Sequence, residues 1–194
     1  MIITPPVPES NVLVAEMYAA DLRDDGFVYS HTQAMALNPE AHAAFEALIG
    51  AVLPSLGIRT YELATLGAAR ALGSPHCMLA HGRKVLRAEV LDEDTLAAVA
   101  RGDDSGLDPA DAAVVRFAEK LSTDASAMTE ADSRSLRDHG FTDRQIVDIA
   151  LAAGLRNLLS RTLKALAVPM EGVPGLSPAL VDALLAPARR VSGG

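Results

Sequence analysis

The sequence has very little cysteine and few aromatic residues. Among its 194 residues there is one cysteine and no tryptophan, and aromatic residues make up 4%. A single cysteine cannot form a disulfide within the chain, so the fold depends on the burial of apolar side chains. The β-branched residues form no alternating runs of the kind that predict strands. Because 49% of the residues are hydrophobic, mainly Ala and Leu, the composition favours packed helices.

Clusters of basic residues are also missing from the sequence. The formal net charge is −8, which argues against nucleic acid as a partner. The longest apolar stretch, residues 146–168, is interrupted by polar side chains that include Arg156, Arg161 and Lys164, and such charges are costly in a bilayer. The first ten residues have neither the basic nor the apolar segment of a signal peptide. We therefore expect a cytoplasmic protein with no membrane contact.

Helix starts and stops are readable along the chain. A capping residue followed by proline, a typical start, occurs at Asn38-Pro39, Ser74-Pro75, Asp108-Pro109 and Ser177-Pro178. Two further starts resemble capping boxes, Thr129 with Asp132 and Thr142 with Gln145. Helix stops in a left-handed conformation are expected at Gly50, Gly73, Gly102 and Gly140.

These signals predict an all-α protein with a single compact domain of about eight or nine helices. The expected helices span residues 10–23, 39–52, 60–72, 75–88, 92–101, 109–122, 129–138, 143–167 and 178–187. We interpret residues 1–9 as an N-terminal extension, 10–170 as the helical domain, and 171–194 as a tether with a docking helix. Residues 1–9 and 188–194 are expected to be disordered or lightly tethered.

The residues that suggest chemistry lie between positions 61 and 81. If Ser74 caps the helix and Pro75 is its first residue, Cys77 falls in the first turn, near free backbone N–H groups. A helix N-terminus stabilises an anion by roughly 0.3–1 kcal/mol. The placement therefore favours a Cys77 thiolate.

Two histidines and one glutamate can assist this cysteine. His81 follows Cys77 by four residues, so both side chains lie on one helix face, within reach of a direct or water-mediated hydrogen bond. His76 points about 100° away on an ideal helix, which leaves its role less defined. Glu62 belongs to the preceding helix, and a helical hairpin at Gly73 would bring its carboxylate to the next helix. A Glu62–His81–Cys77 proton relay would then be complete.

Each of these residues also has a structural interpretation. A lone cysteine in an Ala- and Leu-rich helix is usually a small core residue. His81 could be a solvated histidine, and Glu62 could complement the dipole of its own helix. A metal site of His76, Cys77 and His81 would have poor tetrahedral geometry, because all three ligands come from one short helical segment. No metal and no cofactor are expected.

Over roughly residues 10–170, the sequence resembles the alkylhydroperoxidase D-like and carboxymuconolactone decarboxylase superfamily, particularly its peroxidase-related branch. Members carry a Glu and then Cys-x-x-Cys-x-x-x-His at a helix start, with the Glu twelve residues before the first Cys. Here Glu62 lies twelve residues before Ser74, and Cys77 and His81 match the second cysteine and the histidine. His76 stands where some peroxidase members place a histidine that assists proton transfer.

The resemblance implies an alkylhydroperoxidase D-like helical fold and a homo-oligomer, a trimer or hexamer. It also implies that Cys77 is the cysteine that attacks peroxide. Because Ser74 replaces the first cysteine of the pair, no internal disulfide can form, and an external thiol or a second subunit must reduce the oxidised cysteine.

The leading hypothesis is therefore a one-cysteine hydroperoxide reductase that acts on a small hydroperoxide with an external thiol reductant. Glu62 and His81 would move the proton, and Ser74 would cap the helix and could hydrogen-bond the sulfur of Cys77. One alternative is a lyase or isomerase that uses His81 and Glu62 as acid and base on a small lactone or dicarboxylate. Another is a redox sensor or scaffold without catalysis.

Overall fold

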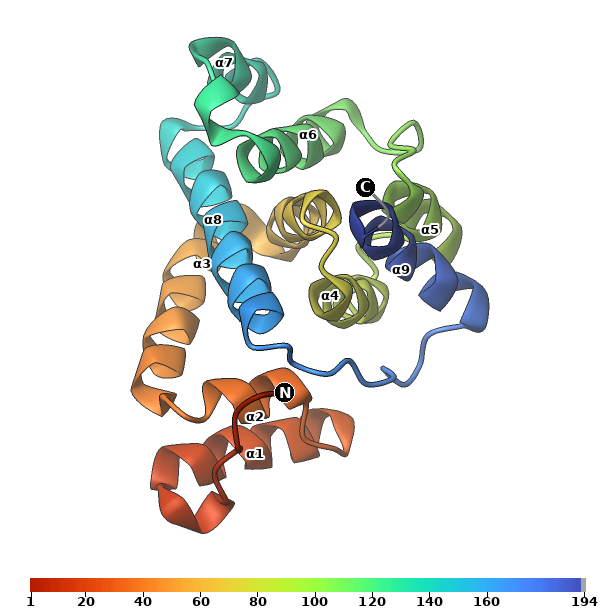
Figure 1. The fold of residues 1–194 in the computed structure, drawn as a ribbon. Coiled ribbons are helices and arrows are strands. Elements are labelled where there is room, and N and C mark those ends of the chain that lie inside the picture. The colour runs from red at the N-terminus through yellow and green to blue at the C-terminus, as the bar shows by residue number, and fades with distance from the viewer. Residues whose placement is uncertain (193–194) are drawn as a thin grey trace. The chain divides into compact units, whose positions relative to one another are not determined.

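The computed structural model describes residues 1–192, and these form nine α-helices, two short 3-10 turns and no strand (Figure 1). The prediction of an all-α fold is confirmed. The helices are α1 (Val12–Asp25), α2 (Ser30–Met35), α3 (Pro39–Ala71), α4 (Pro75–Arg87), α5 (Glu93–Arg101), α6 (Pro109–Thr123), α7 (Glu130–Asp138), α8 (Asp143–Ala165) and α9 (Pro178–Ser192). The turns are Pro8–Ser10 and Ala125–Ala127.

All four helix starts predicted from a capping residue followed by proline are confirmed in position. The side chains of Asn38 and Ser177 accept hydrogen bonds from the backbone amide three residues further on, at 3.0 and 3.1 Å. Asp108 and Ser74 occupy the capping position, but their side chains cap nothing. Both capping boxes form as predicted, with Thr129 paired to Asp132 and Thr142 paired to Gln145.

The predicted break at Gly50 is wrong. Residue 50 lies inside α3, and the chain leaves helical geometry at Gly57 instead, where φ is 70° and ψ is 164°. A side chain strongly disfavours this backbone conformation, so glycine is the residue that permits it. Gly73, Gly102 and Gly140 take positive φ values of 55°, 96° and 89°, as expected for residues that end helices.

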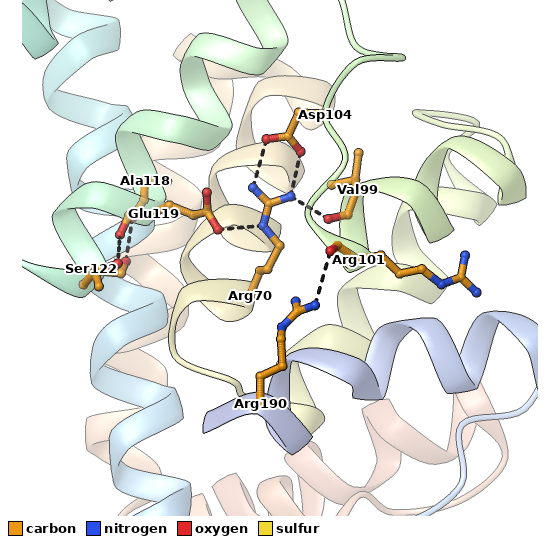
Figure 2. Close-up of polar contacts among 9 residues, drawn as sticks. Arg70, Val99, Arg101, Asp104, Ala118, Glu119, Ser122 and Arg190 are labelled. Atoms are coloured by element: carbon orange, nitrogen blue, oxygen red, sulfur yellow. Dashed lines mark hydrogen bonds and ion pairs between the residues drawn. The ribbon is translucent and has the colours of Figure 1, made fainter. Parts of the chain in front are cut away.

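Two helical segments differ from the sequence prediction. The six-residue helix α2 was not predicted, because it is too short to show an apolar period. Helix α9 continues through Pro187 to Ser192, beyond the predicted end at 187, so the prediction of a disordered C-terminus is wrong for residues 188–192. Near this end, Nη1 of Arg190 donates to the carbonyl of Arg101 at 3.2 Å (Figure 2). Residues 193–194 lie outside the described part of the chain.

The helices form two compact units. One consists of residues 1–51 and 161–174, and the other of residues 52–160 and the chain from 175 onward. In the first unit, Val14, Tyr18 and Ala36 form a small core. The second unit contains every residue that the sequence analysis selected as a candidate for chemistry.

The second unit is held by close helix packing and by a buried ion-pair cluster. Leu184 of α9 packs against Gly82 of α4, where an added Cβ would meet its side chain at 2.8 Å. Arg70 of α3 binds Glu119 through Nε at 2.7 Å and Asp104 through Nη1 at 2.6 Å and Nη2 at 3.0 Å (Figure 2). These contacts connect α3 to α6 and to the chain segment that follows α5.

Helix α3 is the one described helix that is long and apolar enough to cross a membrane by length and composition. Its helical geometry is interrupted at Gly57, and residues 61–70 are all buried within the second unit. Glu62 and Arg70 in this stretch pair with other side chains of the same unit. This half of α3 is therefore the core helix of a compact unit.

Two helical glycines allow a test of the packing. An added Cβ at Gly67 would lie 2.7 Å from the backbone oxygen of Val115 and 3.3 Å from the Cβ of Ala118, whereas one at Gly154 would meet nothing within 4 Å. We expect Gly67→Ala to lower the free energy of unfolding by about 1–3 kcal/mol, because α3 and α6 must move apart. Gly154→Ala should raise it by roughly 0.5–1 kcal/mol, because alanine restricts the unfolded chain.

Chemical unfolding of the two variants beside the wild-type protein measures this difference. Equal stability of Gly67→Ala and Gly154→Ala would contradict the close packing of α3 on α6.

Candidate functional site

Cys77 is the third residue of α4 and is buried, with 2% of its surface exposed. The predicted position in the first helical turn is therefore confirmed. Its side chain has two polar neighbours, and both come from α8. The sulfur lies 3.2 Å from Oγ of Ser160 and 3.7 Å from Nη1 of Arg156. Ser160 and Arg156 are themselves 1% and 3% exposed, so the thiol faces a cation and a hydroxyl group away from bulk solvent.

Glu62 and His81 form a buried pair next to this cysteine. Oε2 of Glu62 lies 2.6 Å from Nδ1 of His81, which joins α3 to α4. Burial, with the positive charge of Arg156, lowers the pKa of His81 to about 4. Burial by itself raises the pKa of Glu62, but the charge and hydrogen bond of His81 outweigh it and hold that pKa below its usual value.

These shifts define the protonation of the pair at neutral pH. Glu62 is a carboxylate and His81 is a neutral imidazole, because each pKa lies below 7. Nδ1–H of His81 then donates to the carboxylate, and Nε2 carries the lone pair. A neutral histidine oriented by a carboxylate can act as a proton acceptor.

The structure brings together part of the relay expected from the sequence. The contact between Glu62 and His81 is present, and His81 lies one turn after Cys77 on α4. Within the described chain, however, the polar side-chain contacts of Cys77 are with Ser160 and Arg156, and no direct hydrogen bond joins its sulfur to His81. The geometry leaves the transfer between Cys77 and His81 to a water molecule or a bound substrate.

Ser74 does not have the role predicted for it. It is buried and precedes α4, but its side chain makes no capping hydrogen bond. Its backbone N–H is used in the turn at Gly73, where it donates to the carbonyl of Ala69 at 3.0 Å. The hydroxyl group that contacts the sulfur belongs to Ser160 instead.

His76 adjoins Cys77 in the first turn of α4 and is only partly exposed. On an ideal helix its side chain projects away from that of Cys77.

Arg156 and Ser160 were not identified as site residues from the sequence. They lie 79 and 83 residues after Cys77, and only the tertiary fold brings α8 to the start of α4. Their one sequence signal is a charged residue and a serine one helical turn apart within the apolar stretch 146–168. Burial by itself lowers the pKa of Arg156, but negative charge at Cys77, Tyr61 and Glu62 outweighs it and raises that pKa. Arg156 therefore remains a cation in the core.

Among residues 1–192, no group of three His, Cys, Asp or Glu side chains is arranged to hold a metal ion. The reactive groups that the site offers are the thiol of Cys77, the cation of Arg156, the hydroxyl of Ser160 and the Glu62–His81 pair. Such a set can form a thiolate, stabilise it by charge and move a proton.

Two solved structures of peroxidase-related proteins share this fold. An uncharacterized peroxidase-related protein from Ralstonia eutropha, described as an alkylhydroperoxidase AhpD core, is 21% identical, with 96% of each chain covered and a TM-score of 0.77. A second, from a Silicibacter species, is 24% identical, with 89% of this chain and 90% of the other covered and a TM-score of 0.74.

The debrominase Bmp8 is a third structural relative. Its apo structure is 16% identical, covers 95% of this chain and 98% of its own, and has a TM-score of 0.76. Another structure of Bmp8, a cysteine-to-alanine variant, contains 2,3,4-tribromopyrrole. At these identities the similarity concerns the fold.

Sequence comparison agrees with the structural one. A search of curated proteins gives no match, but residues 39–120 match the carboxymuconolactone decarboxylase family. This segment contains Glu62, Ser74, Cys77 and His81, whereas Arg156 and Ser160 lie beyond it. The comparisons therefore show a match to the carboxymuconolactone decarboxylase family over residues 39–120 and a helical fold shared with alkylhydroperoxidase D-like and peroxidase-related proteins.

Proposed function

We propose that this protein is a one-cysteine, thiol-dependent hydroperoxide reductase. The observation that carries the proposal is the position of the Cys77 sulfur, which is buried 3.7 Å from the guanidinium of Arg156 and 3.2 Å from the hydroxyl of Ser160. A neighbouring cation and hydrogen-bond donor favour the thiolate, which is the reactive form of cysteine. The superfamily includes enzymes, and two proteins with this fold are described as peroxidase-related.

In the proposed reaction, the Cys77 thiolate attacks one oxygen of the hydroperoxide. A sulfur–oxygen bond forms and the oxygen–oxygen bond breaks, so the sulfur is oxidised to a sulfenic acid and the peroxide is reduced. The leaving oxygen departs as an alkoxide or hydroxide and takes up one proton. The products are the sulfenic acid and an alcohol or water.

The proton is handled by the Glu62–His81 pair. Neutral His81 accepts the thiol proton when the thiolate forms, and the Glu62 carboxylate 2.6 Å away stabilises the imidazolium. The same proton then passes to the leaving oxygen. Since no direct hydrogen bond joins His81 to the sulfur, the proposal includes a water molecule or the substrate itself as the carrier.

Two equivalents of an external thiol complete the cycle. The first condenses with the sulfenic acid, which gives a mixed disulfide and water, and the second releases Cys77 as a thiol together with the oxidised reductant. The chain has no other cysteine, and Ser74 occupies the position of the first cysteine in the superfamily pattern that the sequence resembles. The reductant must therefore come from outside the chain.

A lyase or isomerase is the second candidate. One observation favours it, the direct buried bond between Glu62 and His81, which is independent of Cys77. In that reaction the pair would act as acid and base on a small lactone, the substrate class that the family name indicates. Activity on a lactone would survive Cys77→Ser and would be lost in His81→Gln.

The reductase proposal predicts how four variants react with peroxide. After one equivalent of hydrogen peroxide, a sulfenic acid probe followed by mass spectrometry should label the wild-type protein and not Cys77→Ser. His81→Gln and Glu62→Gln should form the sulfenic acid at least about 100-fold more slowly, the range expected for loss of acid–base catalysis. His139→Gln, which changes an exposed histidine, is the matched control and should react like the wild type. An unlabelled wild-type protein would exclude the reductase and leave the lyase.

The protonation of His81 predicts a pH dependence of stability. The folded-state pKa is lowered to about 4, whereas an unfolded histidine has a pKa of about 6.5. Between these values the unfolded chain binds more protons, so the free energy of unfolding falls as the pH is lowered, by about 1 kcal/mol per pH unit. Below the unfolded pKa of its carboxyl, Glu62 adds to the same loss.

Urea unfolding from about pH 7 to about pH 4.5 tests this dependence. His81→Gln removes the titrating group, so its stability should fall less steeply than that of the wild type, while His139→Gln should follow the wild type. Parallel curves for the wild type and His81→Gln would show that His81 is not buried in its neutral form.

A further inference from the structure

The second unit contains two buried arginines whose surroundings differ. Arg70 is 6% exposed, and each nitrogen of its guanidinium is bonded: Nε to Glu119, Nη1 to Asp104 and the Val99 carbonyl, and Nη2 to Asp104 (Figure 2). Arg156 is 3% exposed. Its Nη1 lies 3.7 Å from the sulfur of Cys77, and its Nε has no hydrogen-bond partner.

This difference separates a structural arginine from one that is available to a ligand. A buried cation is stabilised when carboxylates surround it, as Asp104 and Glu119 surround Arg70. No carboxylate forms an ion pair with Arg156 among residues 1–192. An unbonded N–H on a buried charge costs free energy, because it has lost its bonds to water without gaining a new acceptor. Such a donor is expected where a ligand provides the missing acceptor.

A second unpaired group lies on the neighbouring helix. Oγ1 of Thr65 is buried and has no hydrogen-bond partner. Thr65 follows Tyr61 by one turn of α3. Burial raises the pKa of Tyr61, and this rise is opposed by the positive charge of Arg156 and by contacts of the Arg156 and Thr65 side chains with the Tyr61 hydroxyl group. The two unpaired groups therefore both lie near the Tyr61 hydroxyl, and Arg156 also reaches the sulfur of Cys77.

We propose that Arg156 is a catalytic residue of the peroxide reaction and that it acts at two points. Through Nη1 it holds the Cys77 thiolate. Through the unpaired Nε–H, together with the hydroxyl of Thr65, it binds the oxygen that leaves when the oxygen–oxygen bond breaks. This inference rests on the proposed reductase function and adds Arg156, which lies beyond the family match at residues 39–120, and Thr65, which lies within it.

The chemistry of the step matches these donors. As the sulfur bonds to one peroxide oxygen, the other oxygen keeps the electron pair of the broken bond and becomes negative until it receives a proton. A fixed cationic N–H and a hydroxyl group stabilise that charge in a site from which water is largely excluded. In this proposal Arg156 and Thr65 act like an oxyanion hole, because their hydrogen-bond donors are in place before the leaving oxygen becomes negative.

The same burial limits the substrate. Tyr61, Thr65, Cys77, Arg156 and Ser160 are each 4% exposed or less. Side chains enclosed to this degree cannot contact a bulky ligand unless the helices around them move. We therefore assign hydrogen peroxide or a short alkyl hydroperoxide as the substrate class, and exclude bulky aromatic and lipid hydroperoxides.

Three variants separate the two roles of Arg156. Arg156→Met removes the charge and every donor, Arg156→Lys keeps the charge without the planar Nε–H, and Thr65→Val removes only the hydroxyl. Arg144→Met is the control, because Arg144 lies on the same helix with a side chain that is 73% exposed. Two readouts are measured for each protein. The first is the pH profile of thiolate absorbance, which reports the one cysteine once the profile of Cys77→Ser is subtracted to remove the contribution of the three tyrosines. The second is the rate of sulfenic acid formation with hydrogen peroxide.

We expect Arg156→Met to move the thiolate profile to higher pH and to slow the peroxide reaction about 100-fold or more. Arg156→Lys should keep a thiolate profile near that of the wild type but react with peroxide about 10-fold more slowly, and Thr65→Val should behave similarly. The wild type should react much faster with hydrogen peroxide than with cumene hydroperoxide, and Arg144→Met should match the wild type in both readouts.

Other results would overturn the inference. If Arg156→Met keeps the wild-type profile and rate, Arg156 has neither role. If Arg156→Met does not fold, wild-type peroxide rates in both Arg156→Lys and Thr65→Val would remove the role at the leaving oxygen. If the wild-type protein does not react with peroxide, both the reductase function and the role of Arg156 at the leaving oxygen are excluded. A shifted thiolate profile in Arg156→Met would then still support the contact between Arg156 and the Cys77 thiolate.

Discussion

The burial of a positive charge without a carboxylate partner is the constraint on which the site depends. Arg156 lies in the core of the second unit, where water cannot solvate it, and its Nη1 lies 3.7 Å from the sulfur of Cys77. Negative charge on that sulfur would in turn stabilise the cation. Helix α8 must pack against the start of α4 for this contact to exist. The packing of the core therefore determines which groups surround the thiol.

Local chemistry was largely predictable from the sequence. The place of Cys77 in a first helical turn follows from the proline at position 75, and the pairing of Glu62 with His81 follows from the helical hairpin at Gly73, so both depend on residues that are close in sequence. The partners of the sulfur were not predictable, because 79 residues separate Arg156 from Cys77. Only the packing of two distant helices brings them together, and a single sequence carries no direct record of that packing.

The errors in the predicted fold have a similar origin. Gly50 and Gly57 both interrupt an apolar pattern, and composition does not tell which of them takes a positive φ. Ser74 has the side chain of a good cap, but the turn at Gly73 and the backbone bond to Ala69 fix its geometry differently. The last helix was expected to end at residue 187, yet α9 continues to Ser192. In each case the tertiary structure outweighs a local preference.

The burial of the only sulfur atom has a consequence for how the protein can be observed. With 2% of its surface exposed, Cys77 can meet a bulky thiol reagent only when α4 or α8 moves away from the other. When reclosing is faster than modification, the labelling rate reports the equilibrium between closed and open forms, as amide exchange does for a single N–H group. Because the chain has a single cysteine, the rate at which a thiol reagent labels it measures local unfolding of the core around Cys77.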